Sequence, residues 1–213
     1  MVEPAVHEGR CGALEWAVCA SPFPGQRRSG DAFLVEGTPR GVLVAVVDGL
    51  GHGDEAAAVA DRATESLRRT AGRSPTACLE ACHAALRGSR GAAVTLAAVD
   101  PDCSRLAWVA VGNVEAAVVG PRRGGRSVTR WTVTLRGGVV GDRLPPLRES
   151  NAPLRDGDVL VSATDGLAPA FLDGVDPSLP TRQLACALHA RYARADDDAL
   201  VLAVRCRQGP DRR

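Results

Sequence analysis

Short apolar runs separated by turns dominate the chain. One of the most apolar is VLVAVV at residues 42–47, and others cover residues 15–20, 32–36, 92–99, 106–111, 114–119, 128–135, 159–164 and 199–205. Turn-rich segments such as SPFPGQRRSG and GTPRG separate several of them. Short apolar runs between turn residues are typical of strands, so we predict a strand at each of these runs.

Three segments have helical spacing instead. Apolar residues at positions 56, 59, 60, 63 and 67 recur at intervals of three and four, which predicts a first helix. A second helix is predicted from Ser74 and Pro75, a good N-cap followed by a proline in the first turn, to about residue 86. A third helix fits residues 181–194.

The order of these elements predicts the fold class. Strands cluster at both ends of the sequence with a helix pair inserted early, which is not the regular alternation of a doubly wound sheet. We predict an α+β domain in which mostly antiparallel strands stack as a sandwich, with helices packed outside. Because no repeat or long linker divides the chain, residues 1–213 are predicted to form one domain, with a core from about 15 to 205 and a polar tail at 206–213.

Composition and charge narrow the function classes. The formal net charge of +1 offers no basic face for a nucleic-acid partner. No apolar stretch approaches the roughly 20 residues that cross a bilayer, and the first ten residues lack the pattern of a secretory signal. The seven cysteines are irregularly spaced without a CxxC pair, which favours reduced thiols over a disulfide framework or a zinc site. We therefore expect a cytoplasmic protein with neither a nucleic-acid nor a membrane partner.

Aspartates stand at the ends of four apolar runs. Asp48 and Asp165 each follow a run and precede Gly-Leu, whereas Asp31 and Asp197 lie just before runs. In an antiparallel arrangement all four could meet at one end of the sandwich, where their repulsion would require cations. Hard oxygen ligands without a thiolate or imidazole cluster indicate Mg²⁺ or Mn²⁺. The alternative is that each Asp merely begins or ends a turn, but the repetition favours a shared site.

The ordered motifs resemble a known family. They are PGQRRSGDAFLV, VVDGLGHGDEAA, VGNVEA, DGDVLVSATDGL and DDALVLAV. This set is similar to the metal-dependent serine/threonine protein phosphatases (PPM), in particular the SpoIIE-like branch and its small RsbX-like members. The resemblance covers about residues 15–205. It implies a four-layer α-β-β-α sandwich, two mainly antiparallel sheets flanked by helices, with two Mn²⁺ or Mg²⁺ ions.

The resemblance also implies roles for individual residues. Asp48 would bridge both ions and be central to catalysis, and the carbonyl of Gly49 would support one ion. Asp165 and Asp197 would hold one ion, and Asp31 would be an additional acidic ligand. A metal-bridging hydroxide would attack phosphorus in line, without a phosphoenzyme.

Other site residues have less direct matches. His52 either protonates the leaving oxygen as general acid, or caps the following helix or packs in the turn. Asp198 would lie just behind the ligands. Arg28, or its neighbour Arg27, is a candidate to bind the substrate phosphate through charge-assisted hydrogen bonds. Gly112–Asn113 is interpreted as a hairpin turn.

These implications predict a function. The expected activity is metal-dependent hydrolysis of phosphoserine or phosphothreonine in phosphorylated antagonist or scaffold proteins of a bacterial partner-switching pathway that controls a sigma factor. Two alternatives remain: a catalytically inactive domain that binds a phosphoprotein, and a metallophosphatase acting on small molecules.

Overall fold

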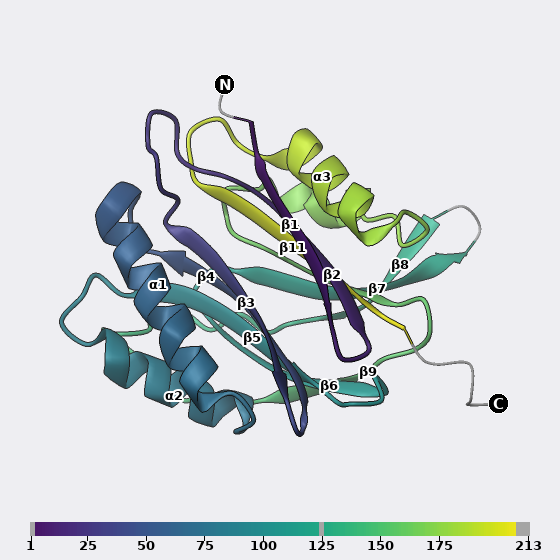
Figure 1. The fold of residues 1–213 in the computed structure, drawn as a ribbon, viewed down its shortest axis with the longest axis horizontal. Helices are drawn as coiled ribbons and strands as arrows, with labels where there is room; N and C mark the ends of the chain where they lie inside the picture. Colours follow the sequence, from purple (N-terminus) through teal and green to yellow (C-terminus); the bar gives the residue numbers. More distant parts are fainter. Residues whose placement is uncertain (1–2, 124–125, 208–213) are drawn as a thin grey trace.

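Two antiparallel sheets form the framework of the computed structural model, which describes residues 3–123 and 126–207 (Figure 1). The six-stranded sheet has the order β1-β2-β11-β10-β7-β8 and the five-stranded sheet the order β3-β4-β5-β6-β9. The strands of the first are β1 (Ala5–Cys11), β2 (Leu14–Ser21), β11 (Ala199–Cys206), β10 (Val159–Ala163), β7 (Glu115–Arg123) and β8 (Arg126–Thr132). Those of the second are β3 (Asp31–Thr38), β4 (Gly41–Gly49), β5 (Ala92–Val99), β6 (Arg105–Val111) and β9 (Ser150–Pro153).

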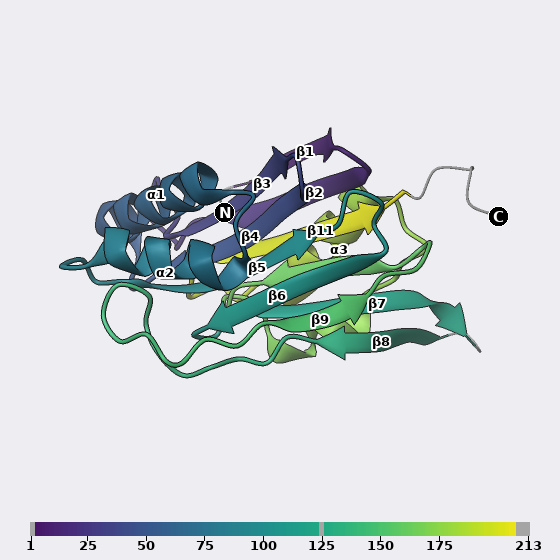
Figure 2. The same cartoon turned by 90° about the horizontal axis from the view of Figure 1, so that it is seen from below.

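The helices cover the outer faces of both sheets. The pair α1 (Gly53–Thr70) and α2 (Pro75–Leu86) lies against the five-stranded sheet. The six-stranded sheet is covered by α3 (Thr181–Tyr192) and a 3₁₀ helix (Pro169–Gly174). Figures 1 and 2 show the two groups of helices on opposite sides of the stacked sheets. The predicted four-layer α+β sandwich is therefore confirmed.

Three apolar layers hold these four structural layers together. Val46, Trp108 and Leu202 are among the residues between the two sheets. A second layer lies under α1 and α2, and a third lies under α3. Strand β4 is covered on both faces, so its residues 41–47 are all buried. This double burial explains why VLVAVV lacks the alternation of a strand with one wet face.

The local signals for helices act as expected at the start of α2. Ser74 is the N-cap, and its side chain accepts a hydrogen bond from the backbone N–H of Ala77 at 3.3 Å. Pro75 occupies the first turn, where its missing N–H costs no intrahelical bond. The third helix is shorter than predicted and ends at Tyr192.

Several predictions about the connections are wrong. Gly112–Asn113 is not a hairpin turn, because it joins β6 in one sheet to β7 in the other. Strands β7 and β8 reach residues 123 and 126, beyond the runs predicted at 114–119 and 128–135, and residues 124–125 lie outside the described residues. Strand β1 was not predicted, because none of its residues is buried and exposed polar residues interrupt its apolar ones. An edge strand allows such a sequence. Cys206, predicted to be the first residue of the polar tail, still belongs to β11. Residues 208–213 lie outside the described part.

Crossing a bilayer requires a helix that is both long and predominantly apolar. In the part of the chain that the structure describes, no helix meets both requirements.

Candidate functional site

Four aspartates from both sheets meet at one end of the sandwich. Asp31 at the start of β3 and Asp48 near the end of β4 are direct partners in the antiparallel register. Asp165 follows β10 and Asp197 precedes β11, and these two strands are neighbours in the other sheet. We call these four residues the carboxylate cluster. The expectation that strand ends would bring them to a shared edge agrees with this geometry.

Burial and charge repulsion raise the pKa values of three members of the cluster. Burial raises the pKa of Asp48 to about 7, with further contributions from the charges of Asp165 and Asp197. The pKa of Asp31 is raised well above its usual range by burial and then by Asp48. Burial and the charge of Asp165 also raise the pKa of Asp197. Removing these carboxylates from water and placing them together disfavours their charged forms, which a bound cation would restore.

Two hydrogen bonds position members of the cluster. Thr164 donates its hydroxyl proton to Asp31 Oδ2 at 2.7 Å and accepts a hydrogen bond from the N–H of Leu200 at 3.0 Å. It therefore links the two sheets. Asn113 donates its side-chain N–H to Asp165 Oδ2 at 2.6 Å. Neither Thr164 nor Asn113 was predicted as a site residue, although each lies inside a motif that was recognised.

Asp198 holds the loop before β3. Its buried carboxylate accepts hydrogen bonds from the N–H of Phe23 at 2.7 Å and of Gly30 at 3.0 Å. A Cβ on Gly30 would lie 2.8 Å from the Cβ of Ala56, so the loop comes closer to α1 than a side chain would allow. The N–H of Asp198 in turn donates to the carboxylate of Asp197 at 2.9 Å. Asp198 therefore connects the cluster to residues 22–30.

The side chain of His52 does not cap α1 but stacks on the loop before β3. It occupies the N-cap position of α1, but its side chain makes no capping hydrogen bond, so that alternative is wrong. Its ring stacks on Phe23 with centroids 4.3 Å apart and an interplanar angle of 15°. Arg28 donates to Asp61 Oδ2 on α1 at 2.5 Å, and both side chains are substantially exposed. The guanidinium of Arg28 thus already has an acidic partner on α1.

Arg27 has a different setting from Arg28. It lines a cavity of about 360 Å³ together with Asp31, Ser29 and Phe33. This cavity therefore adjoins the carboxylate cluster through Asp31. Of the two candidate phosphate-binding arginines, Arg27 is the one that lines a cavity together with Asp31 of the cluster.

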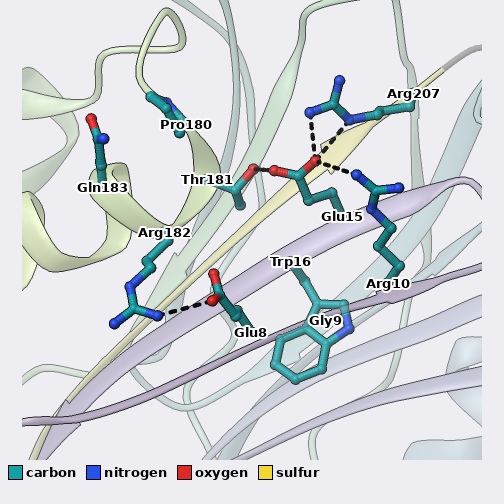
Figure 3. Close-up of a pocket in the computed structure, with 10 residues that line it drawn as sticks. All are labelled: Glu8, Gly9, Arg10, Glu15, Trp16, Pro180, Thr181, Arg182, Gln183 and Arg207. Atoms are coloured by element: carbon teal, nitrogen blue, oxygen red, sulfur yellow. Dashed lines mark hydrogen bonds and ion pairs between the residues drawn. The ribbon is translucent and has the colours of Figure 1, made fainter.

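A further cavity lies away from the cluster. It has a volume of about 480 Å³ and is bordered by β1, β2 and the start of α3 (Figure 3). Within it, Glu15 accepts hydrogen bonds from Thr181 at 2.8 Å and from Arg207 at 2.7 Å. A separate ion pair joins Arg182 and Glu8 at 2.9 Å. Each charged group of this cavity thus has a partner of opposite sign, with both Arg10 and Arg207 paired to Glu15.

The donor set of the cluster fits a divalent cation. Four carboxylates and the nearby carbonyl of Gly49 are the oxygen ligands that Mg²⁺ and Mn²⁺ prefer. Across residues 3–123 and 126–207, however, no three His, Cys, Asp or Glu side chains have the spacing of a formed metal site. The fit therefore rests on donor chemistry and on the mutual repulsion of the carboxylates, and not on a preformed cage.

Comparison with known proteins identifies the family. The family model described as stage II sporulation protein E (SpoIIE) matches residues 38–207. The chain belongs to the SpoIIE family. The resemblance to the SpoIIE-like branch of the metal-dependent phosphatases is thereby confirmed. Among curated proteins, no sequence matches this SpoIIE-family chain.

Solved structures share the fold of this SpoIIE-family chain. RsbX in complex with magnesium has a TM-score of 0.80 at 18% identity, covering 95% of this chain and 100% of its own. A structure from work on the bacterial stressosome, a modular system adapted to control secondary messenger signalling, has a TM-score of 0.78 at 28% identity, covering 90% and 99%. The catalytic domain of the serine/threonine phosphatase PstP with two manganese ions has a TM-score of 0.66 at 16% identity, covering 90% and 97%. The chain therefore has the PP2C-type phosphatase fold.

Proposed function

We propose that this protein is a metal-dependent phosphatase that removes phosphate from phosphoserine or phosphothreonine in proteins. The observation that carries the proposal is the carboxylate cluster, in which residues from two sheets meet at a single edge, and where burial and charge repulsion raise the pKa values of Asp31, Asp48 and Asp197. Such an arrangement is unfavourable without a cation and suits one well. The SpoIIE family and the PP2C-type fold support the same conclusion.

Two divalent cations would be held by the carboxylate cluster, Asp48 included, together with the Gly49 carbonyl. RsbX with magnesium and PstP with two manganese ions support this choice of Mg²⁺ or Mn²⁺. When bound, the ions would supply Lewis-acid activation of water and neutralise the negative charge of the phosphate.

The chain's own residues would position the ligands and the substrate. Asn113 holds Asp165 through a 2.6 Å hydrogen bond, and Thr164 holds Asp31 through one of 2.7 Å. Ligands that are already oriented lose less freedom when a metal ion binds, which favours binding in one geometry. Asp198 would contribute indirectly, by fixing the loop that leads into Asp31.

His52 and the arginines complete the proposal. The His52 ring, fixed against Phe23, would protonate the leaving oxygen as general acid, and His52→Ala would then lower turnover most for substrates with poor leaving groups. Arg27, from the cavity beside Asp31, is better placed than the paired Arg28 to bind the substrate phosphate. Comparing Arg27→Ala with Arg28→Ala tests this, since a phosphate-binding residue should raise KM when removed.

The proposed substrates are phosphorylated regulators, either antagonists of an anti-sigma factor or stressosome-like scaffolds, acting in the cytoplasm. Support comes from RsbX and from the stressosome structure, both of which align over nearly their whole length. The cysteines are consistent with a reducing compartment, because no disulfide bond joins those that the structure describes.

The decisive experiment measures phosphate release from a phosphoserine protein and from p-nitrophenyl phosphate, with and without Mn²⁺. Asp48→Asn should abolish release, as should a chelator. The matched control is Asp196→Asn, because Asp196 is exposed and contacts Arg194 outside the cluster. Activity that survives chelation or Asp48→Asn would overturn the proposal. Release from p-nitrophenyl phosphate alone would indicate a phosphatase of small molecules, and metal binding without release would indicate a phosphoprotein-binding domain.

A further inference from the structure

Two cysteines meet at the end of the sandwich opposite the carboxylate cluster. Cys103 lies in the turn between β5 and β6, where its N–H donates to the carbonyl of Asp100 at 2.9 Å. Cys206 is the last residue of β11, the strand whose other end follows Asp197. Both side chains belong to the apolar layer between the sheets, where Cys103 is 1% and Cys206 6% exposed. Their thiols are joined by a hydrogen bond.

The two thiols are chemically unequal. The hydrogen bond from Cys206 lowers the pKa of Cys103, whereas the same bond and burial raise the pKa of Cys206. Thiolate character makes a cysteine reactive toward oxidants. Cys103 is therefore suited to react first, and Cys206 is placed to resolve the product.

A small oxidant can approach Cys103 through a cavity. Cys103 lines a cavity of about 360 Å³ between the β1–β2 turn, the β3–β4 turn and the start of the β5–β6 turn. Leu14 also lines it and is the register partner of Cys206 in β2. The wall of the cavity is therefore formed by Cys103 itself and by the strand residue next to Cys206.

We propose that Cys103 and Cys206 form a reversible disulfide bond when a peroxide oxidises the protein. The sulfur of Cys103 attacks one peroxide oxygen, the O–O bond breaks, and a sulfenic acid and water are formed. The sulfur of Cys206 then displaces the hydroxyl group as a second water. The two sulfurs together lose two electrons and two protons, and one peroxide is reduced to two waters. A dithiol such as dithiothreitol reverses the bond by exchange.

Other cysteines are less suited to this reaction. Cys19 on β2 and Cys186 on α3 are also joined by a hydrogen bond, but burial raises the pKa of Cys19 to about 12. Burial likewise raises the pKa of Cys82 to about 12, and its neighbour Cys78 on α2 is fully buried. The contrast makes Cys186→Ser the matched control, since it removes a paired thiol of similar kind elsewhere.

The bond would tie the two sheets together at the end away from the proposed metal site. It would close a chain segment of roughly 100 residues, which strongly restricts the unfolded state. We expect the oxidised protein to melt roughly 5–10 °C higher than the reduced protein, with dithiothreitol reversing the shift. This inference does not depend on the proposed phosphatase activity.

The test treats the full chain, first reduced with dithiothreitol, with hydrogen peroxide. Non-reduced peptide mapping should find Cys103 linked to Cys206 both in the wild-type protein and in Cys186→Ser. Cys103→Ser should lose the bridge and the melting shift. In Cys206→Ser, dimedone should label a sulfenic acid at Cys103.

Three results would overturn the proposal. They are a bridge only between Cys19 and Cys186, oxidation of Cys103 to sulfinic or sulfonic acid without a bridge, and an unmodified Cys103 under peroxide that oxidises the single Met. Because the wild-type peptide map needs no variant, a variant that fails to fold does not leave the question open.

Discussion

Replacing Asp198 by alanine would release residues 22–30 from the six-stranded sheet. This side chain is 4% exposed and accepts hydrogen bonds from the backbone N–H groups of Phe23 and Gly30. Alanine leaves the two N–H groups without this acceptor. The loop would have to move outward for them to form hydrogen bonds with water instead. The perturbation is specific, because Asp198 does not pack as a hydrophobic residue and its removal leaves only a small void.

The magnitude follows from these two bonds. A hydrogen bond to a charged group contributes about 1.5–3 kcal/mol, so two of them contribute about 3–6 kcal/mol. Part of the loss is offset, because the charge of Asp198 also repels Asp48 and Asp31 and raises their pKa values. We expect a net loss of about 2–4 kcal/mol in the free energy of unfolding. Asp198→Asn keeps one acceptor oxygen and should lose about half as much.

Two measurements check this prediction. Urea unfolding gives the change in free energy, and limited trypsin digestion reports on the loop, which contains Arg27 and Arg28. Cleavage after these arginines should accelerate in Asp198→Ala. The control Asp196→Ala alters an exposed neighbour and should change neither result. If Asp198→Ala differs from wild type by less than about 0.5 kcal/mol and is cut at the same rate, the loop does not depend on this carboxylate.

Three other predictions concern charge, ion pairing and backbone shape. In the presence of a chelator, stability should fall as pH rises from about 4 to about 7. The reason is that the pKa of Asp48 is higher in the folded than in the unfolded protein, so the folded state holds its proton to a higher pH. Melting curves should show that Mn²⁺ or Asp48→Asn reduces this fall. Asp158→Ala should lower the free energy of unfolding in urea by about 3–5 kcal/mol. Arg130 is largely buried and lies 2.8 Å from Asp158, and the substitution leaves it without this partner. A loss below about 1 kcal/mol would argue against this pair as a buried contact. Gly112→Ala should cost about 1–3 kcal/mol from its φ of +95° alone, and more from contact with Ala93, as measured by the same assay; an unchanged stability would contradict the described backbone.

The sequence predicted the layers of the fold well because the buried central strands are predominantly apolar runs. Val42–Val47 could be recognised for this reason, and Ser74 with Pro75 marked the start of α2. Strand β1 could not be recognised, because an edge strand needs little apolar sequence. The crossing at Gly112–Asn113 was mistaken for a hairpin, since a tight turn between two strands does not reveal whether they share a sheet.

The site could be predicted only in outline. Aspartates at strand ends indicated the carboxylate cluster, but the partners of each carboxylate depend on contacts between distant segments. Thr164 and Asp31 are far apart in the sequence and become neighbours only when the two sheets stack. The stacking of His52 on Phe23 likewise depends on the path of a loop that no local pattern determines.

The division of the carboxylate cluster between the two sheets has a consequence for how the protein could be taken apart. Asp31 and Asp48 lie on one sheet, and Asp165 and Asp197 belong to the other, with the Thr164 hydrogen bond between the two pairs. A fragment ending near residue 113 carries one pair, and the remaining chain carries the other. Neither fragment alone holds all four aspartates, so recovery of metal binding on mixing would report directly that the two fragments had assembled.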